Sequence, residues 1–445
     1  MRTPTGTSAA PSAPGSPTRP GLRDAFRFAV QRRGVVLIAP QVAFLGAFIV
    51  VYGAALGVTA GRLGADAPVV VFAVLTGFVS ILVGLGLGWR RWGAATMPAT
   101  GTRPAPSPWL LPFALATTAV GLGALALYFI RIGGFPLLMQ GAEQGRVDAS
   151  ERGGAPLRVL ALLALLGSWL LVAVAARSRR VIPLLAAGGL VLFVAAAWIL
   201  TANRAPSFMA VEVAIVIAVS LAGGLRVPWP LTGLLVAMAI AGVLLAGAIG
   251  AVRLGSAAAQ GPPAPGQTSV PQPRRDYLPL VGIAISGYAQ VPVQNLRYTM
   301  DAVPERIGWR LGMTYLQPLL TVLPGRQTTF DADLKTALDQ RYLGGGTVPG
   351  LLGESYANFG PVGWAVIPGL IAYGLVWLFG LARRHDTVAA WALYAFTIVH
   401  AANATISGMI VASPFPYIAL GVLGAATALE AWHRRQGRGE LGSIG

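Results

Sequence analysis

Ten apolar runs, each long enough to cross a bilayer, dominate the sequence. They fall at 35–59, 67–88, 108–130, 156–176, 181–200, 205–224, 230–251, 362–382, 387–411 and 413–432. Since a helix rises about 1.5 Å per residue, roughly 20 residues cross about 30 Å of hydrocarbon. Only 11% of the residues are charged, against about 25% in a soluble domain. The sequence therefore predicts an all-α polytopic membrane protein of about ten transmembrane helices.

The arginines predict the orientation of these helices. With the amino terminus in the cytoplasm, the short connections on that side hold the basic clusters at 90–91, 177–180, 383–384 and 434–438. An excess of Arg in short connections marks the cytoplasmic side. Both termini are therefore expected in the cytoplasm, and much of the net charge of +17 serves orientation. No nucleic-acid partner is expected, because no basic domain with interleaved aromatic residues occurs.

Polar segments divide the chain into regions. In order, these are a disordered cytoplasmic tail with a basic amphipathic stub at 1–33, a seven-helix transmembrane region at 34–251 with an external loop at 131–155, a large external loop of short helices at 252–361, a three-helix transmembrane region at 362–432 and a cytoplasmic tail at 433–445. The absence of cysteine excludes disulfides and thiolate metal sites, and three histidines make a histidine-rich metal site improbable. We therefore expect no thiolate or histidine-rich metal site, and no cofactor is predicted.

The stretch 344–363, GGGTVPGLLGESYANFGPVG, carries a carboxylate, a phenol and an amide within five residues. Irregular, glycine-rich backbone is tolerated at membrane depth only where it is enclosed by protein or lines a wet cavity. Within a helical turn, Glu354 and Asn358 would share a face, with Tyr356 between them in the sequence. The stretch thus predicts a pocket. The alternative is an ordinary entry to the eighth span, with Glu354 stabilising the helix dipole.

Two further positions carry ionisable groups in apolar surroundings. Arg204 ends a very short outer turn, and Glu212 follows it by eight residues, inside the next predicted span. An ionisable residue within the bilayer is a functional hypothesis by default. The alternative is that Arg204 reaches lipid headgroups and Glu212 bonds a neighbouring helix. His400 lies in the ninth span, where imidazole suits proton abstraction near neutral pH, unless it is a structural histidine.

Arginines also gather over the predicted outer face. They are Arg131, Arg146, Arg152, Arg297, Arg306, Arg310 and Arg341. A guanidinium group stays charged and makes paired hydrogen bonds with phosphate or carboxylate. As a group they predict binding of a pyrophosphate or an acidic sugar, although any single one is more often a solvated loop charge.

Three of these elements resemble the O-antigen polymerase (Wzy-type) and oligosaccharide repeat-unit polymerase families. They are GGFPLL at 133–138 followed by Arg146, the Asn203–Arg204 turn, and PGLLGESYANFGPVG at 349–363, which is similar to a GExYxNFGxxG-like family element. The resemblance covers residues 110–385. It implies an inverting, metal-independent C-type glycosyltransferase whose active site faces outward from the cytoplasmic membrane.

Such an enzyme moves a growing glycan from undecaprenyl pyrophosphate to a lipid-linked oligosaccharide repeat unit, and a chain-length regulator is a possible partner. On this assignment Glu354 and His400 are the catalytic candidates. The candidates for substrate binding are Arg146, Arg204, Arg297, Arg341, Tyr356, Asn358 and Glu212.

Two other functions remain open. An O-antigen ligase would use the same donor with a different acceptor, and the sequence barely distinguishes it from a polymerase. A lipid-linked oligosaccharide flippase or transporter belongs to another class. It would place charged residues along several spans, whereas the polar residues here concentrate at the predicted outer mouth.

Overall fold

The computed structural model describes residues 39–59, 61, 63–92, 105–138, 155–178, 180–201, 203–222, 277–320, 328–340, 347–409 and 414–442. Within these ranges the regular elements are all helical, and eight helices are long and apolar enough to cross a membrane. The protein is accordingly a multi-pass membrane protein.

Most of the long helices match the predicted runs to within a few residues. The long helices are α3 (Pro40–Thr59), α4 (Ala67–Trp92), α5 (Leu110–Ile132), α8 (Leu163–Ser178) with the short α7 (Ala155–Ala161) before it, α9 (Val181–Ile199), α16 (Pro361–His385), α17 (Val388–Ser407) and α18 (Phe415–Gly442). However, α18 continues as a helix through residues 433–442, which were predicted as part of a cytoplasmic tail. A shorter apolar helix, α10 (Arg204–Ala222), covers the sixth predicted run. The seventh, 230–251, lies outside the described residues. The indistinct boundary between the last two runs is set by Gly408 (φ +85°), where α17 ends.

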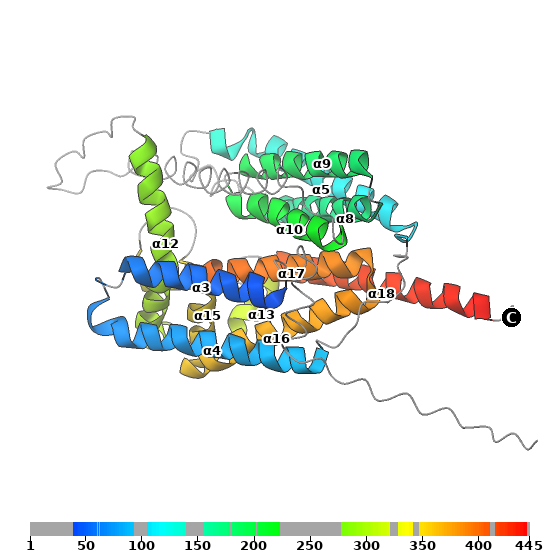
Figure 1. Ribbon diagram of the computed structural model, residues 1–445. Coiled ribbons are helices and arrows are strands. Elements are labelled where there is room, and N and C mark those ends of the chain that lie inside the picture. Colours follow the sequence, from blue (N-terminus) through cyan, green and yellow to red (C-terminus); the bar gives the residue numbers. More distant parts are fainter. Residues whose placement is uncertain are drawn as a thin grey trace, which may run out of the picture.

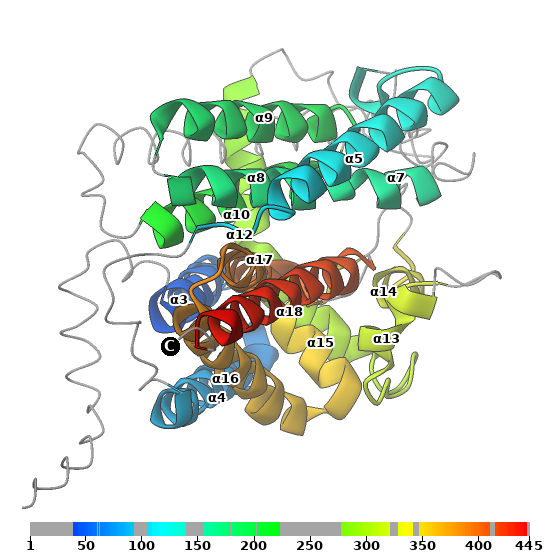
Figure 2. The ribbon, with the colours of Figure 1, turned by 90° about the vertical axis from the view of Figure 1, so that its right-hand side faces the viewer.

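The helices form two groups, which Figures 1 and 2 show one above the other. The upper group holds α5 and α7–α10, and the lower holds α3, α4 and α15–α18. α17 joins them, because it packs on α8 and α10 as well as on its neighbours in the lower group. Consistent with this central position, most α17 residues are buried.

Small residues bring α4 and α16 into backbone contact. The Ser80 hydroxyl donates to the Ala365 carbonyl at 2.6 Å and accepts from the Gly369 amide at 2.8 Å. A Cβ on Gly84 would lie 2.0 Å from the Gly369 oxygen. In membranes, helices associate through such close packing because lipid offers no hydrophobic drive between them. This pair is therefore tightly locked.

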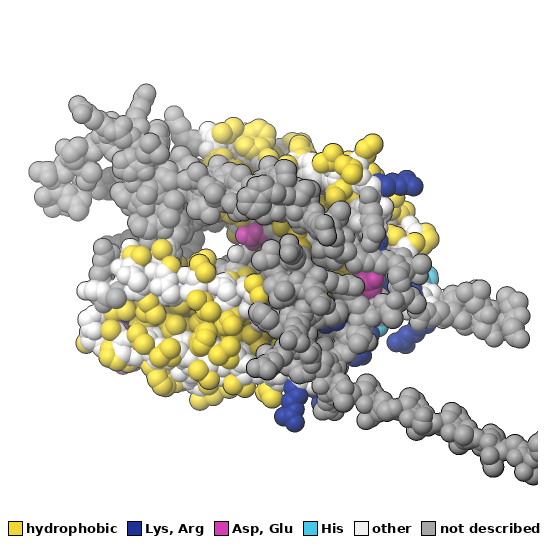
Figure 3. Space-filling model, in the orientation of Figure 1, with side chains coloured by type: hydrophobic (Ala, Val, Ile, Leu, Met, Phe, Trp, Pro, Cys, Tyr) yellow, Lys and Arg dark blue, Asp and Glu magenta, His cyan; other side chains and the backbone are white. Residues whose placement is uncertain are grey.

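The two ends of the lower group differ in charge. α4 and α16 both end in arginines, Arg90–Arg91 and Arg383–Arg384; we call this the arginine end, and the opposite one the α15 end, after α15 (Gly350–Phe359). Figure 3 shows the visible Lys and Arg side chains on the half toward the arginine end, with apolar side chains covering the α3–α4 face. This distribution is typical of a membrane-embedded bundle.

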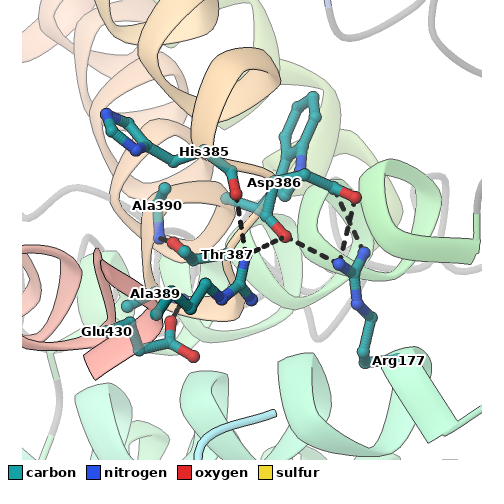
Figure 4. A network of polar contacts seen from close by, with 9 residues as sticks. Arg177, His385, Asp386, Thr387, Ala389, Ala390 and Glu430 are labelled. Carbon is teal, nitrogen blue, oxygen red and sulfur yellow. Dashed lines mark hydrogen bonds and ion pairs between the residues drawn. The ribbon is translucent and has the colours of Figure 1, made fainter. Parts of the chain in front are cut away.

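A buried ion pair joins the two groups at the arginine end (Figure 4). Arg177 of α8 donates to both carboxylate oxygens of Asp386, at 3.1 and 3.0 Å, and to its carbonyl at 2.6 Å. Asp386 lies in the turn between α16 and α17 with left-handed φ +45°. It also accepts from the Trp391 indole at 3.0 Å. A bidentate pair of this kind gives geometric specificity as well as energy.

The same turn is tied to α18. Thr387 caps α17 by accepting from the Ala390 amide at 3.1 Å, and the buried Glu430 accepts from the Ala389 amide at 2.8 Å. Arg434 donates to the His385 carbonyl at 2.8 Å. Both acceptors at the start of α17 satisfy amides that a helix leaves unbonded.

The expected short helices over the α15 end are accompanied by one long helix. α12 (Tyr277–Ala302) has 26 residues, contains Pro292 and lies across the end of the bundle, at a steep angle to the spans (Figure 1). The expected pattern is met by α13 (Met313–Leu320) and α14 (Phe330–Ala337), with eight residues each, and by α15 with ten. α12 packs on α3 and α15, so it helps to roof the site described next.

Candidate functional site

Glycines shape α15 and its return into α16. Gly350 begins the helix at φ +68°, and Gly360 ends it at φ +62°, a region that disfavours other residues. A Cβ on Gly363 would lie 2.0 Å from the Ser355 oxygen. The GESYANFGPVG segment therefore encodes a short helix that folds back closely on the next span.

Glu354 of α15 is completely enclosed by protein. Its Oε1 accepts from the Thr314 hydroxyl at 3.2 Å, and its Oε2 accepts from the Met409 amide. Both contacts come from outside α15, one from α13 and one from the segment after α17. A buried carboxylate is tolerated only when it is hydrogen-bonded in this way, so Glu354 ties these segments together.

His400 of α17 approaches the same residue. Its Nε2 hydrogen-bonds the Met409 carbonyl, and its ring stacks on Phe396 with centroids 5.6 Å apart. Because a carbonyl oxygen only accepts, Nε2 must carry the proton. The neutral ring then keeps a lone pair on Nδ1, to which none of the described residues donates. His400 is partly buried, and its arrangement suits it to accept a proton.

Asn358 fastens the segment between α12 and α13 onto α15. Its Nδ2 donates to the Thr314 hydroxyl at 2.6 Å and to the Glu354 carbonyl at 2.9 Å, while its Oδ1 accepts from the Gly312 amide at 2.8 Å. Glu354 and Asn358 do share a face, as their spacing predicted. Because Asn358 is fully buried, its amide serves protein partners in this conformation.

Two tyrosines adjoin this cluster from α13 and α18. Burial and the negative charge of Glu354 raise the pKa of Tyr315, against smaller lowering by hydrogen bonds with Ser355 and Asn358. Tyr417 donates to the Tyr315 carbonyl. Thr314, Tyr315, Met409 and Tyr417 were not predicted. A backbone amide such as that of Met409 has no sequence signal, and the hydroxyls became relevant only through tertiary contact.

Tyr356 points away from Glu354 into an aromatic cluster. It stacks on Trp364 with centroids 5.2 Å apart and meets Trp309 edge-on at 5.3 Å. Burial, and then the charge of Glu305, raise the pKa of Tyr356. Trp309 itself is 42% exposed, so this cluster reaches the surface at the α15 end.

Glu212 joins α10 to α17. Its Oε2 accepts from Asn403 Nδ2 at 2.8 Å, and Asn403 lies three residues after His400 on the same helix. Residues so spaced share a helix face. The structure thus gives Glu212 a partner on a neighbouring helix, which agrees with the simpler of its two interpretations, and places that partner beside His400 on α17.

The predicted arginines are less completely defined. Arg146 and Arg341 lie outside the described residues. Arg204 is the first residue of α10, and the structure does not describe its side chain. Arg297 of α12 forms an ion pair with Asp66 at 2.6 Å, with both side chains about 40% exposed, and so would have to exchange this partner to bind an anion. Their substrate-binding roles stay predictions.

Within the described residues, no group of three or more His, Asp or Glu side chains could hold a metal ion. Comparisons of the chain with protein-family models, with curated proteins and with solved structures found no match. The helices define the class, a multi-pass membrane protein. Any assignment of activity therefore depends on the groups around α15.

Proposed function

We propose that this protein is a polysaccharide polymerase. It transfers a growing glycan from undecaprenyl pyrophosphate to a lipid-linked oligosaccharide repeat unit at the outer face of the cytoplasmic membrane, without a metal or cofactor. The observation that carries this proposal is the bridge from Glu354 through Met409 to His400, which joins a buried carboxylate to an imidazole whose Nδ1 receives no hydrogen bond from the described residues.

The orientation follows from the arginines. On the positive-inside rule the arginine end faces the cytoplasm, so the α15 end faces outward, where lipid-linked glycans would be presented. Both termini are then cytoplasmic, and the predicted total of ten spans includes the run at 230–251, which lies outside the described residues.

The proposed chemistry is an inverting displacement. The hydroxyl of the acceptor sugar attacks the anomeric carbon, the bond from that carbon to the pyrophosphate oxygen breaks, and the configuration inverts. The hydroxyl proton passes to Nδ1 of His400. Glu354 holds Met409, and through it the imidazole, and its negative charge favours the imidazolium that forms. Undecaprenyl pyrophosphate leaves as the anion.

The leaving anion needs positive charge. Arg204 stands at the first turn of α10, where a helix N-terminus also favours anions, and Arg146 and Arg341 belong to loops on the same predicted face. We assign the pyrophosphate to this group. Tyr356 and Trp309 are suited to contact sugar rings, whereas the buried Asn358 is assigned to holding the segment 310–314.

Reconstitution tests the proposal. The purified full chain in liposomes with purified lipid-linked repeat units should form glycans of several repeats. His400→Gln should lose elongation, because the glutamine amide can still donate to the Met409 carbonyl but cannot accept the proton. Arg204→Ala should also lose elongation at an unchanged protein level. Units that cross the bilayer without any longer glycan would identify a flippase instead.

Deletion of the gene separates polymerase from ligase. Loss of long glycan chains with single repeat units retained on the final acceptor marks a polymerase. Loss of all capped glycan marks a ligase, and would contradict the acceptor assigned here while leaving the donor unchanged.

A further inference from the structure

A separate pocket opens at the α15 end, between α13 and α14. Its volume is about 350 Å³, at the lower end of the roughly 300–1,000 Å³ that is usual for small-molecule sites. It has an apolar wall of Trp309, Met313 and Leu320 and a polar wall of Arg310, Gln317, Thr328 and Asp333. None of these was singled out from the sequence except Arg310, as one of the outer arginines.

The apolar wall is held in place from behind. Trp309 meets Tyr356 edge-on at 5.3 Å, and Gly360 leaves room for the indole, since a Cβ there would lie 3.2 Å from Cη2. The residue nonetheless stays 42% exposed, and Met313 stays 44% exposed. The pocket therefore presents a fixed aromatic surface to whatever enters it.

The polar wall has no net charge. Arg310 Nη2 lies 2.8 Å from Asp333 Oδ2, and Asp333 Oδ1 accepts from the Thr328 hydroxyl at 2.7 Å. Among the described residues, the buried atoms Arg310 Nε and Gln317 Oε1 have no hydrogen-bond partner. With a guanidinium group, an amide, a hydroxyl and a carboxylate on one side, the wall favours a ligand that offers both donors and acceptors.

We propose that this pocket binds a neutral sugar ring of the glycan, an inference that rests on the polymerase function proposed above. A sugar ring has C–H groups on its faces for the indole and hydroxyls at its edge for the planar amide, guanidinium and carboxylate groups. A pyrophosphate would instead require positive charge that Asp333 does not already neutralise.

A single segment, residues 310–314, separates the pocket from Glu354. Residues 310–314 form its wall on one side and bond α15 on the other, through Arg310 N to Ala357 O at 2.9 Å and Thr314 Oγ1 to Glu354 Oε1 at 3.2 Å. A sugar held against Trp309 would thus place its neighbour in the glycan toward the Glu354–His400 bridge.

Binding measured without turnover tests the inference. The probes are oligosaccharides released by mild acid from the lipid-linked pool of the source cells, and inorganic pyrophosphate, added to the full chain in nanodiscs. Calorimetry or saturation-transfer NMR should detect the oligosaccharides. Trp309→Ala and Gln317→Leu should each weaken this binding about tenfold. Trp377→Ala is the matched control, because Trp377 is also 42% exposed but lies on α16.

The possible outcomes distinguish failure of the pocket assignment from failure of the proposed polymerase function. Oligosaccharide binding that is absent, or unaffected in both pocket variants, overturns the pocket assignment even if the reconstituted protein polymerises. Pyrophosphate binding by the wild type that Arg310→Met abolishes also overturns it. Asp333→Asn should create pyrophosphate binding by leaving Arg310 uncompensated. If the protein binds sugar as stated yet makes no polymer, the proposed function fails and the sugar site stands.

Discussion

Glu354 and His400 hold the two ends of one residue, Met409. The carboxylate accepts from its amide, and the imidazole donates to its carbonyl. Met409 therefore links the carboxylate to the imidazole through the two ends of one residue. The positions of the imidazole base and of the carboxylate charge therefore both depend on the backbone of Met409, just beyond the end of α17.

Replacement of Glu354 should separate chemistry from folding. In Glu354→Gln, the amide oxygen can still accept from Met409 and the amide nitrogen can donate to Thr314, so thermal stability should change little. Elongation should nonetheless fall by about 10²-fold or more, in kcat and not in KM, because the charge beside His400 is gone. The measurements are chain length in liposomes and thermal unfolding in nanodiscs.

Glu354→Ala is the contrasting variant. It leaves the Met409 amide without its partner, at a cost of about 1–3 kcal/mol, and should lower both stability and activity. Wild-type chain lengths in Glu354→Gln would contradict the assignment.

Loss of the Asn358 amide should release the segment 310–314. Asn358→Leu removes the bonds to Gly312, Thr314 and the Glu354 carbonyl and should destabilise the protein by about 1–3 kcal/mol. Hydrogen exchange at the Gly312 amide should accelerate. Thr336→Val is the control, because that exposed hydroxyl bonds only its own helix at Ala332. Unchanged exchange at Gly312 would show that Asn358 does not hold the segment.

The ion pair at the arginine end should be far more important for stability than its exposed counterpart. Asp386→Asn keeps a residue type that tolerates the left-handed turn but removes the negative charge that faces the buried Arg177, at a cost of up to about 3–5 kcal/mol. Adding Arg177→Met should recover part of this loss in thermal unfolding. For the exposed pair, Asp66→Asn should cost about 0–1 kcal/mol. Equal losses at the two pairs would contradict the argument from burial.

Asp331 should make stability depend on pH. Burial raises the pKa of this α14 carboxyl above its usual value near 3.8, so the folded state binds the proton more tightly than the unfolded state. Lowering the pH through the raised pKa toward 3.8 should therefore stabilise the wild type relative to Asp331→Asn. The variant should be the more stable protein at neutral pH, with the two melting temperatures converging in acid.

The control for this comparison is Asp301→Asn at an exposed position. It removes a carboxylate of the same kind without changing the interior of the protein. A difference for Asp331→Asn that stays constant with pH would exclude Asp331 as the titrating group.

The spans were predictable because one physical requirement, about 20 apolar residues bounded by polar ones, fixes each of them. α12 was not. Its first half is apolar and its second polar and arginine-bearing, and it contains Pro292, so the sequence suggested separate pieces. A helix lying across the end of a bundle meets different surroundings along its length, and its pattern reflects those contacts more than its own continuity.

The site was predictable where a residue's chemistry is unusual for its surroundings. Glu354, Glu212 and His400 stood out for that reason. In the structure His400 lies on α17, and Glu354 and Glu212 hydrogen-bond Met409 just after α17 and Asn403 on α17. Their partners did not stand out. Thr314 and Met409 are ordinary residues whose importance comes from tertiary contacts between segments roughly 40 and 55 residues from Glu354 in the chain.

The contact of Gly84 with Gly369 determines which side of the site can rearrange. α16 continues directly from the turn at Gly360 and is fastened along α4 at backbone distance, so α15 stands on a stationary base. A substrate that reaches the enclosed Glu354 must then displace the opposite side, where Thr314 and Met409 each donate a hydrogen bond to the carboxylate. Opening this side therefore also breaks bonds that orient the carboxylate, so access to Glu354 and its orientation are coupled.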